Sequence, residues 1–305
     1  MFSTDDFITL PYTPDLTEAG IAYTLRSLAF GRSKLDPDFQ REQAAIKSCE
    51  LAFRRFLDAS SLPYHLAPVV DPLSPHILLD GRRCAFHIRL SSERGQISRM
   101  MHHPETLLEE TFDVEDSTAQ EEEDLLIFGF ALALIARSKE DSQKAAASGH
   151  PLRLIYPLPE DWNHPGRLKE YQSLVLKSEI PEPVDIEIGG LDCDLTYFTE
   201  SFHLEPYYRR ISGSKFHRSA FMMTKNLPSG RIGIHHRELA STVLVEPGQW
   251  HNIWVYGMKI ILVGALTRRE MHRIDRERRV REMQIRKNGT NVRVRELKAL
   301  EEFLG

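Results

Sequence analysis

The stretch from Pro75 to His87, Pro-His-Ile-Leu-Leu-Asp-Gly-Arg-Arg-Cys-Ala-Phe-His, contains the strongest local folding signal in the sequence. Asp80-Gly81 lies between two apolar segments. A type I′ turn favours this dipeptide, because both central residues of the turn need a positive φ. The sequence therefore predicts a β-hairpin whose strands cover residues 76–79 and 82–90.

The second strand of this hairpin has two faces, because successive side chains in a strand point to opposite sides. One face carries Cys84, Phe86, Ile88 and Leu90, and the other carries Ala85, His87 and Arg89. Apolar residues with a 3.6-residue period predict two helices before the hairpin, at about 15–30 and 38–59.

The segments after the hairpin continue an α/β pattern. Residues 92–110 predict a helix that is interrupted at Pro104. Residues 124–135 are apolar throughout, which is typical of a strand buried on both faces or of a buried helix. A polar, alanine-rich helix at 139–148 and a strand at 152–158 follow.

This layout resembles the PD-(D/E)xK, or restriction-endonuclease-like, superfamily over about residues 15–158. That family has a helix, three antiparallel strands, a crossover helix and a fourth strand. The resemblance implies an α/β fold, with a mixed sheet flanked by helices, for a first domain at 1–160. Its hallmark is an acid at the start of one hairpin strand, a tight turn, and acid-x-Lys on the partner strand.

In this sequence the hallmark positions fall on His76, Ala85 and His87, and none of them is an acid or a lysine. The family's carboxylates hold Mg²⁺, which prefers oxygen ligands. The resemblance therefore implies a catalytically degenerate pseudo-nuclease with no cofactor. An active, Mg²⁺-dependent endonuclease is the alternative, and it would need relocated acids. The candidates for that role are Glu18, Glu42, Glu50 and Asp71.

The second half of the chain predicts three further regions. Residues 161–183 form a linker with a helix at 167–177. Residues 184–266 alternate short apolar stretches with turn signals, which is typical of a β-rich domain. Residues 267–305 form a basic helical tail, with helices at about 268–283 and 294–304. The resemblance does not extend beyond residue 158.

The net charge of −5 combines two opposite blocks. Ten acids and no Lys or Arg lie between Glu105 and Asp124, a stretch whose role the sequence leaves open and which would suit a built-in DNA mimic. From Thr267 onward, twelve Lys or Arg residues stand against seven acids. This tail is either a phosphate-binding strip or an exposed helix with i to i+4 ion pairs, because glutamates interleave with the arginines.

A second candidate for nucleic-acid contact lies in the β-rich region, where basic and aromatic residues interleave. Aromatic faces stack on bases, while Arg and Lys neutralise phosphates. The residues are Tyr207, Tyr208, Arg209, Arg210, Lys215, Arg218, Lys225 and Arg231.

Several classes of protein do not fit the sequence. Three widely spaced cysteines support neither a disulfide framework nor a zinc finger. No apolar run is long enough for a membrane span, and the acidic N-terminus does not favour export, so we expect a cytoplasmic protein without a membrane contact. Phosphate-binding, dinucleotide-binding and serine-hydrolase motifs are absent from the sequence.

Three functions are left open. We expect a DNA-binding protein or a subunit of a DNA-processing, defence or mobile-element complex. The first alternative is the active nuclease described above. The second is a protein-interaction or assembly subunit that does not contact nucleic acid.

Overall fold

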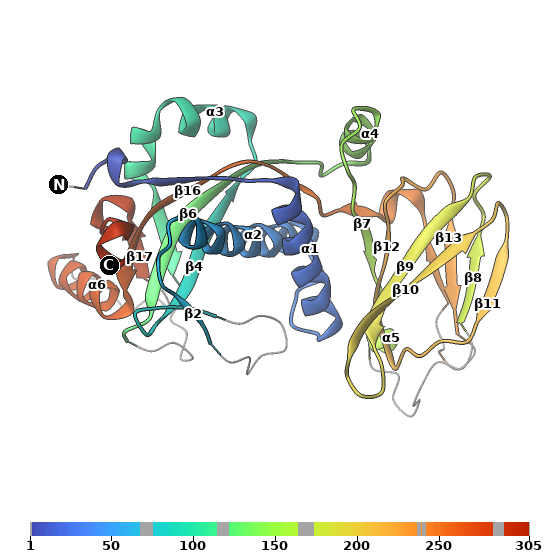
Figure 1. Ribbon diagram of the computed structural model, residues 1–305. Coiled ribbons are helices and arrows are strands. Elements are labelled where there is room, and N and C mark those ends of the chain that lie inside the picture. The colour runs from blue at the N-terminus through green and yellow to red at the C-terminus, as the bar shows by residue number, and fades with distance from the viewer. Residues whose placement is uncertain are drawn as a thin grey trace. The chain divides into compact units, whose positions relative to one another are not determined.

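The computed structural model describes residues 2–67, 76–114, 122–163, 174–236, 239, 242–282 and 290–304. Over these residues the protein is a mixed α/β protein with several β-sheets (Figure 1). The chain divides into two compact units. The first combines Met1–Gly20, Ala45–Leu134 and Val255–Gly305, and the second combines Ile21–Ala44 and Ile135–Trp254.

The described α-helices are α1 (Pro14–Ala29), α2 (Pro37–Ala59), α3 (Arg94–His102), α4 (Lys139–Ala147), α5 (Glu160–Asn163) and α6 (Arg268–Glu282). Short 3-10 helices accompany them at Thr4–Asp6, Pro104–Glu109, Pro247–Gln249, Val294–Glu296 and Leu300–Phe303. The strands of the first unit are β1 (Ile8–Pro11), β2 (His65–Leu66), β3 (Ile77–Leu79), β4 (Arg82–Ser91), β5 (Thr111–Val114), β6 (Leu125–Ile135), β16 (Val255–Thr267) and β17 (Thr290–Arg293). Those of the second unit are β7 (Leu154–Pro157), β8 (Leu174–Ser178), β9 (Val184–Leu191), β10 (Tyr197–Leu204), β11 (Arg209–Ser212), β12 (Arg218–Thr224), β13 (Ile232–His235), β14 (Val243–Val245) and β15 (His251–Asn252).

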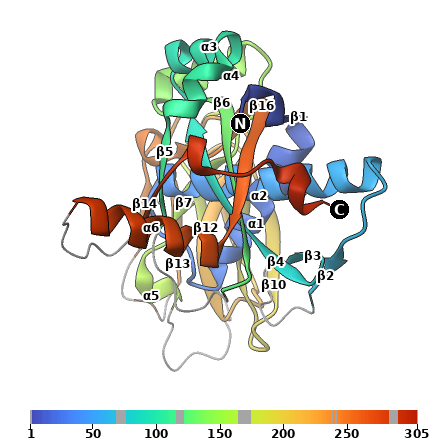
Figure 2. The same ribbon diagram turned by 90° about the vertical axis from the view of Figure 1, so that its left-hand side faces the viewer.

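The first unit is built on a sheet with the strand order β1-β16-β6-β4-β3-β2, in which β16 runs between β1 and β6 (Figure 2). Strands β2, β3 and β4 form an antiparallel meander. The chain then passes through α3 and returns as β6, which pairs in parallel with β4. From α2 to β6 the order is therefore a helix, three antiparallel strands, α3 and a fourth strand parallel to β4, with the 3-10 helix Pro104–Glu109 and β5, which pairs with β17 in another sheet, between α3 and β6.

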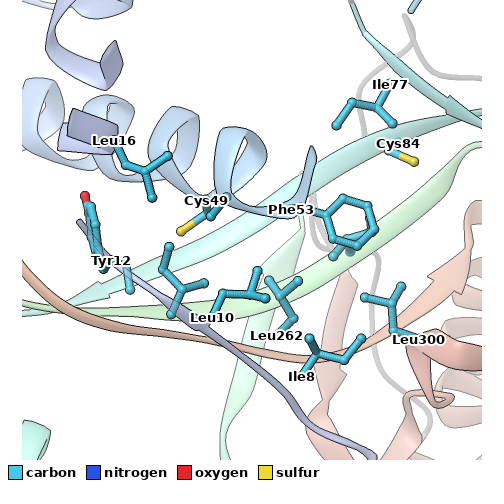
Figure 3. Packing of buried hydrophobic residues seen from close by; sticks show 14 of the residues in the cluster. Ile8, Leu10, Tyr12, Leu16, Cys49, Phe53, Ile77, Cys84, Leu262 and Leu300 are labelled. Atoms are coloured by element: carbon cyan, nitrogen blue, oxygen red, sulfur yellow. The ribbon is translucent and has the colours of Figure 1, made fainter. Parts of the chain in front are cut away.

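Both faces of this sheet are covered. On one face, apolar residues of α2, including Cys49 and Phe53, pack with Leu10 of β1, Ile77 of β3 and Leu262 of β16 (Figure 3). On the other face, apolar side chains of α3, α6, β5 and β17 pack against alternate residues of β6 and β16 and against Ala85 of β4. The sheet is thus the middle layer of three.

The two open interpretations of residues 124–135 are resolved in favour of a strand. In β6, Leu125 and Ile127 belong to the core on the α2 face, whereas Leu126 and Phe128 belong to the core on the opposite face. A strand covered on both faces requires such a continuous apolar run.

The hairpin and the first two helices are confirmed. Asp80 and Gly81 have φ values of 47° and 75°, as a type I′ turn requires. Helices α1 and α2 lie within one residue of the predicted ranges. Residues 92–110 are helical in two parts, as expected, with Pro104 at the start of the second part.

Three expected elements have different places in the structure. The helix at 139–148 and the strand at 152–158 exist as α4 and β7, but both belong to the second unit and not to the first sheet. The helix expected at 167–177 is wrong for residues 174–177, which lie in β8, and residues 164–173 are outside the described chain. Strand β8 contributes Leu174 and Leu176 to a core at a two-residue period, which suits a strand rather than a helix.

The second unit is a β-sandwich. One sheet has the order β10-β9-β12-β7-β15 and the other has the order β11-β8-β13-β14. Their facing residues share one core, which includes Ile186 of β9 and Met222 of β12 from the first sheet, and Leu176 of β8 and Ile234 of β13 from the second. Neighbouring strands within these two sheets are antiparallel throughout the described residues.

The sequence predicted regions that end at residues 160, 183 and 266. The two compact units of the structure are not divided at these positions. Strand β16, expected in the β-rich domain, pairs with β1 in the first sheet. It carries Ile260 and Leu262 on one face and Ile261 and Val263 on the other, and all four are buried. A strand that is apolar on both faces needs an interior place in a covered sheet, and the first unit provides it.

The turn of the hairpin can be tested by Gly81→Ala. Space for a methyl group is open at this position, but a φ of 75° disfavours any side chain, so the free energy of unfolding should fall by about 1–2 kcal/mol. Gly95→Ala in α3 is the matched control, since its surroundings are also open and its φ is not positive. Helix propensity favours the alanine there by up to about 1 kcal/mol. Equal denaturant midpoints for the two variants would contradict the turn assignment.

Candidate nucleic-acid interface

Two of the three hallmark positions lie together on one face of β4. In the parallel register, Ala85 is opposite Leu126 and His87 is opposite Phe128. Both therefore face the core formed with α3, β5 and β17, as the alternation predicted. His76 directly precedes β3, and its carbonyl accepts a hydrogen bond from the amide of Ala67.

His87, where the sequence resemblance would place the family's lysine, is a partly buried imidazole. Its ring stacks on Phe128, with ring centroids 5.3 Å apart and an interplanar angle of 22°. Burial lowers its pKa from 6.5 to about 4, and its Nε2 atom has no hydrogen-bond partner among the described residues. At neutral pH this position therefore holds an uncharged aromatic ring.

The next residue on this face, Arg89, is held by its surroundings. Its guanidinium lies 5.1 Å from the centroid of the Phe112 ring and 5.6 Å from that of Phe130. It donates to Glu110 Oε2 at 2.6 Å and to the carbonyl of Thr111. Arg89 thus joins β4 to the start of β5 and has little capacity left for an external anion.

The residues on the hairpin do not fit a Mg²⁺ site. Strands β3 and β4 contain no Asp or Glu, and Asp80 lies in the turn. Ala85 has no ligand atom, and imidazole nitrogen is a poor ligand for a cation that prefers oxygen. Within the described part of the chain, no group of three His, Cys, Asp or Glu side chains is placed to hold a metal ion.

The helix acids do not gather at the hallmark positions. Glu50 is paired with Lys47 at 2.7 Å on α2, whose core residues cover the face of β4 opposite to Ala85 and His87. Glu18 is exposed on α1. Glu42 is also exposed and belongs to the second unit; burial raises its pKa, with a smaller contribution from Asp38. Asp71 lies outside the described residues.

The basic and aromatic residues of the sandwich form a group at the edge strand β11. Tyr207 and Tyr208, which precede this strand, are 69% and 51% exposed. Arg209 is exposed and pairs in register with Lys177 of β8. Arg210 lies 5.6 Å over the Phe202 ring.

The remaining members of this sequence cluster lie apart or are neutralised. Arg218 begins β12, and Lys225 follows its last residue, so the two are separated by about 20 Å of extended chain. Arg231 binds Glu179 at 2.6 Å and lies 3.8 Å from Glu246. Lys215 is exposed. Burial raises the pKa of Glu200, and the positive charges of Arg210 and Lys215 partly offset this rise.

A second basic surface lies on α6, in the predicted basic tail. Arg269, His272, Arg273 and Arg276 recur at the spacing of one helix face and line a cavity of about 350 Å³ together with Glu122 and Glu270. The spacing was visible in the sequence, but the interleaved acids obscured it. One of these acids, Glu270, is paired in the structure with Lys298, which lies outside the helix.

Comparisons with protein-family models, with curated proteins and with solved structures find no match to this chain. No described helix combines the length and the apolar character that crossing a membrane requires.

The environment of His87 can be tested by the pH dependence of stability. Because its pKa is about 4 in the folded protein and 6.5 ordinarily, the unfolded chain binds more protons between these values. Stability should therefore decrease as the pH falls from 6.5 to 4, by up to about 3 kcal/mol from this group. His87→Leu should lose this contribution, so the difference in the free energy of unfolding between wild type and variant should change across this range. Parallel profiles of the two proteins would contradict the assignment.

Proposed function

We propose that the protein binds nucleic acid, and DNA in particular, as a non-catalytic member of a DNA-processing, defence or mobile-element complex. The observation that carries this proposal is that the hairpin strands β3 and β4, which we interpret as the counterpart of the nuclease hallmark hairpin, contain no carboxylate. The hairpin would still support the fold of the first unit, but it would no longer bind a metal ion.

The order of elements supports a restriction-endonuclease-like core. Helix α2, the meander β2-β3-β4, helix α3 and the parallel strand β6 follow the family's layout. The third antiparallel strand of this layout is β4, and the fourth strand is β6. From the sequence, the third strand was expected at 124–135, the crossover helix at 139–148 and the fourth strand at 152–158. The proposal assigns these roles to β4, α3 and β6 instead.

The filling of the hallmark face supports the loss of catalysis. Phosphodiester hydrolysis in this family needs a metal ion that polarises the phosphate and activates water. The two acid positions hold His76 and Ala85, neither of which has an oxygen ligand in its side chain, and the lysine position holds a neutral imidazole stacked on Phe128. A single acid elsewhere would not replace two facing carboxylates.

Exposed cations supply the means of binding. Arginine and lysine side chains that neutralise phosphates release condensed counterions, and this term dominates binding without base readout. The group at β11 and the face of α6 both offer such side chains. The exposed rings of Tyr207 and Tyr208 add surfaces on which bases of a single strand could stack.

One observation favours the assembly subunit as a second candidate. The outer face of the sheet β11-β8-β13-β14 exposes Ile211 by 64% and Leu244 by 44%. Strand β11 is at the edge of this sheet, where its free backbone groups can pair with another chain. A protein partner would cover both features.

Binding to labelled duplex and single-stranded DNA at several salt concentrations tests the proposal. We expect the affinity to fall steeply with salt, and plasmid DNA with Mg²⁺ or Mn²⁺ to remain uncut. Absence of binding at low ionic strength would contradict nucleic-acid binding and favour the assembly subunit. Metal-dependent cleavage that is lost in Glu50→Gln, but not in His87→Ala, would instead support the active nuclease.

A further inference from the structure

We propose that the exposed face of α6 is a groove that binds the phosphodiester backbone of a nucleic acid. This inference rests on the proposed function and assigns the contact to one element of the first unit. The β11 group would then have a secondary part in binding or none.

The two faces of α6 differ sharply. Met271 is 1% exposed and packs in the core beside β17, and Arg278 is bound to Glu296 at 2.6 Å. Arg269, Arg273 and Arg276 are exposed on the face that lines the groove. The inner face thus anchors the helix, and the outer face remains available to a ligand.

Two acids line the groove, Glu122 and Glu270, and the second is occupied by other contacts. Glu270 accepts hydrogen bonds from Thr267 and lies 2.5 Å from Lys298, so its charge is compensated on the side of the protein. Glu123 approaches Arg269 at 3.6 Å, with both side chains well exposed. An exposed pair at this distance is weak and can be exchanged for a phosphate contact.

Arg273 and Arg276 are the free cations of the groove. Across the described part of the chain, neither has an ion-pair partner within 4.0 Å. Their guanidinium groups offer bidentate donors that match phosphate oxygens. The backbone amides at the start of the helix are not free, because those of Arg268 and Arg269 donate to the carbonyls of Asp124 and Glu122. The side chains must therefore make the contact.

The dimensions of the arginine row suit a backbone rather than a single small anion. From residue 269 to residue 276 a helix rises by about 10 Å. Phosphates of one strand advance by about 3.4 Å along a duplex axis, so this row spans about three of them. The groove is lined only by charged residues and His272, with no Phe, Tyr or Trp on which bases could stack, which favours a contact with the phosphates.

The test compares two double variants that each remove two positive charges. Arg273→Ala with Arg276→Ala alters the groove, and Arg209→Ala with Arg210→Ala alters the β11 group. All four side chains are exposed, so the free energy of unfolding should stay within about 0.5 kcal/mol of wild type. Binding is measured with duplex DNA and duplex RNA of the same sequence over a range of salt concentrations.

The groove variant should reduce the slope of log affinity against log salt by about 2, which is a loss of tens-fold in affinity at 0.1 M salt. The β11 variant should keep most of the wild-type slope. Glu123→Gln should bind more tightly than wild type, because it frees Arg269. Equal losses for DNA and RNA would identify the shared backbone as the ligand.

The outcomes separate this inference from the proposed function. If wild type binds but only the β11 variant loses affinity, the groove is wrong and nucleic-acid binding stands. If wild type binds neither duplex, the proposed function fails, and long-chain inorganic polyphosphate becomes the probe. If wild type binds polyphosphate and the groove variant does not, the groove on α6 still binds phosphate groups. If wild type does not bind polyphosphate either, the groove proposal is overturned together with the proposed function.

Discussion

The burial of β6 on both faces is the constraint on which the first unit depends. Its eleven residues alternate between two apolar cores, so the sheet needs a covering layer on each side. Helix α2 supplies one layer, and α3, α6, β5 and β17 supply the other. Strand β4 lies beside β6 in parallel register and shares both cores. In the middle of β4, the partly buried Phe86, Ile88 and Leu90 pack against one core and Ala85 packs against the other.

This constraint accounts for the residues at the hallmark positions. A carboxylate buried against Phe128 without a cation or hydrogen-bond donors would cost several kcal/mol. Alanine and a neutral histidine are compatible with the core, and Arg89 is tolerated only with Glu110 and two aromatic rings around it. A sheet packed in this way is a scaffold, and its charges are placed at the surface, on α6 and near β11. The proposed contact with nucleic acid follows from that placement.

Local signals in the sequence were sufficient for the hairpin, α1 and α2, and they narrowed β6 to a buried strand or a buried helix. Each has a dense pattern of its own, such as Asp80-Gly81 or the continuous apolar run of β6. The composition of the units was not predictable, because the chain leaves the first unit after residue 134 and returns with β16. Strand β2 has only two residues and depends on its pairing with β3, which no local pattern can indicate.

The candidate site was predictable only in part. The absence of acids from the hairpin strands could be read directly, and the alternation placed Ala85 and His87 on one face. The grouping of basic residues near 207–231 was misleading as a single surface, because strand β12 separates Arg218 from Lys225 and Arg231 is neutralised by Glu179. On α6, partners far along the chain, such as Lys298 for Glu270, decide which charges stay free.

The central claim is that the hallmark face is an apolar core and not a vacant metal site. The most direct measurement is the free energy of unfolding of Ala85→Glu with and without Mg²⁺, since a bound ion stabilises the folded state in proportion to its occupancy. The account predicts a loss of at least about 2 kcal/mol and no effect of Mg²⁺. A variant with wild-type stability that Mg²⁺ stabilises further would contradict it.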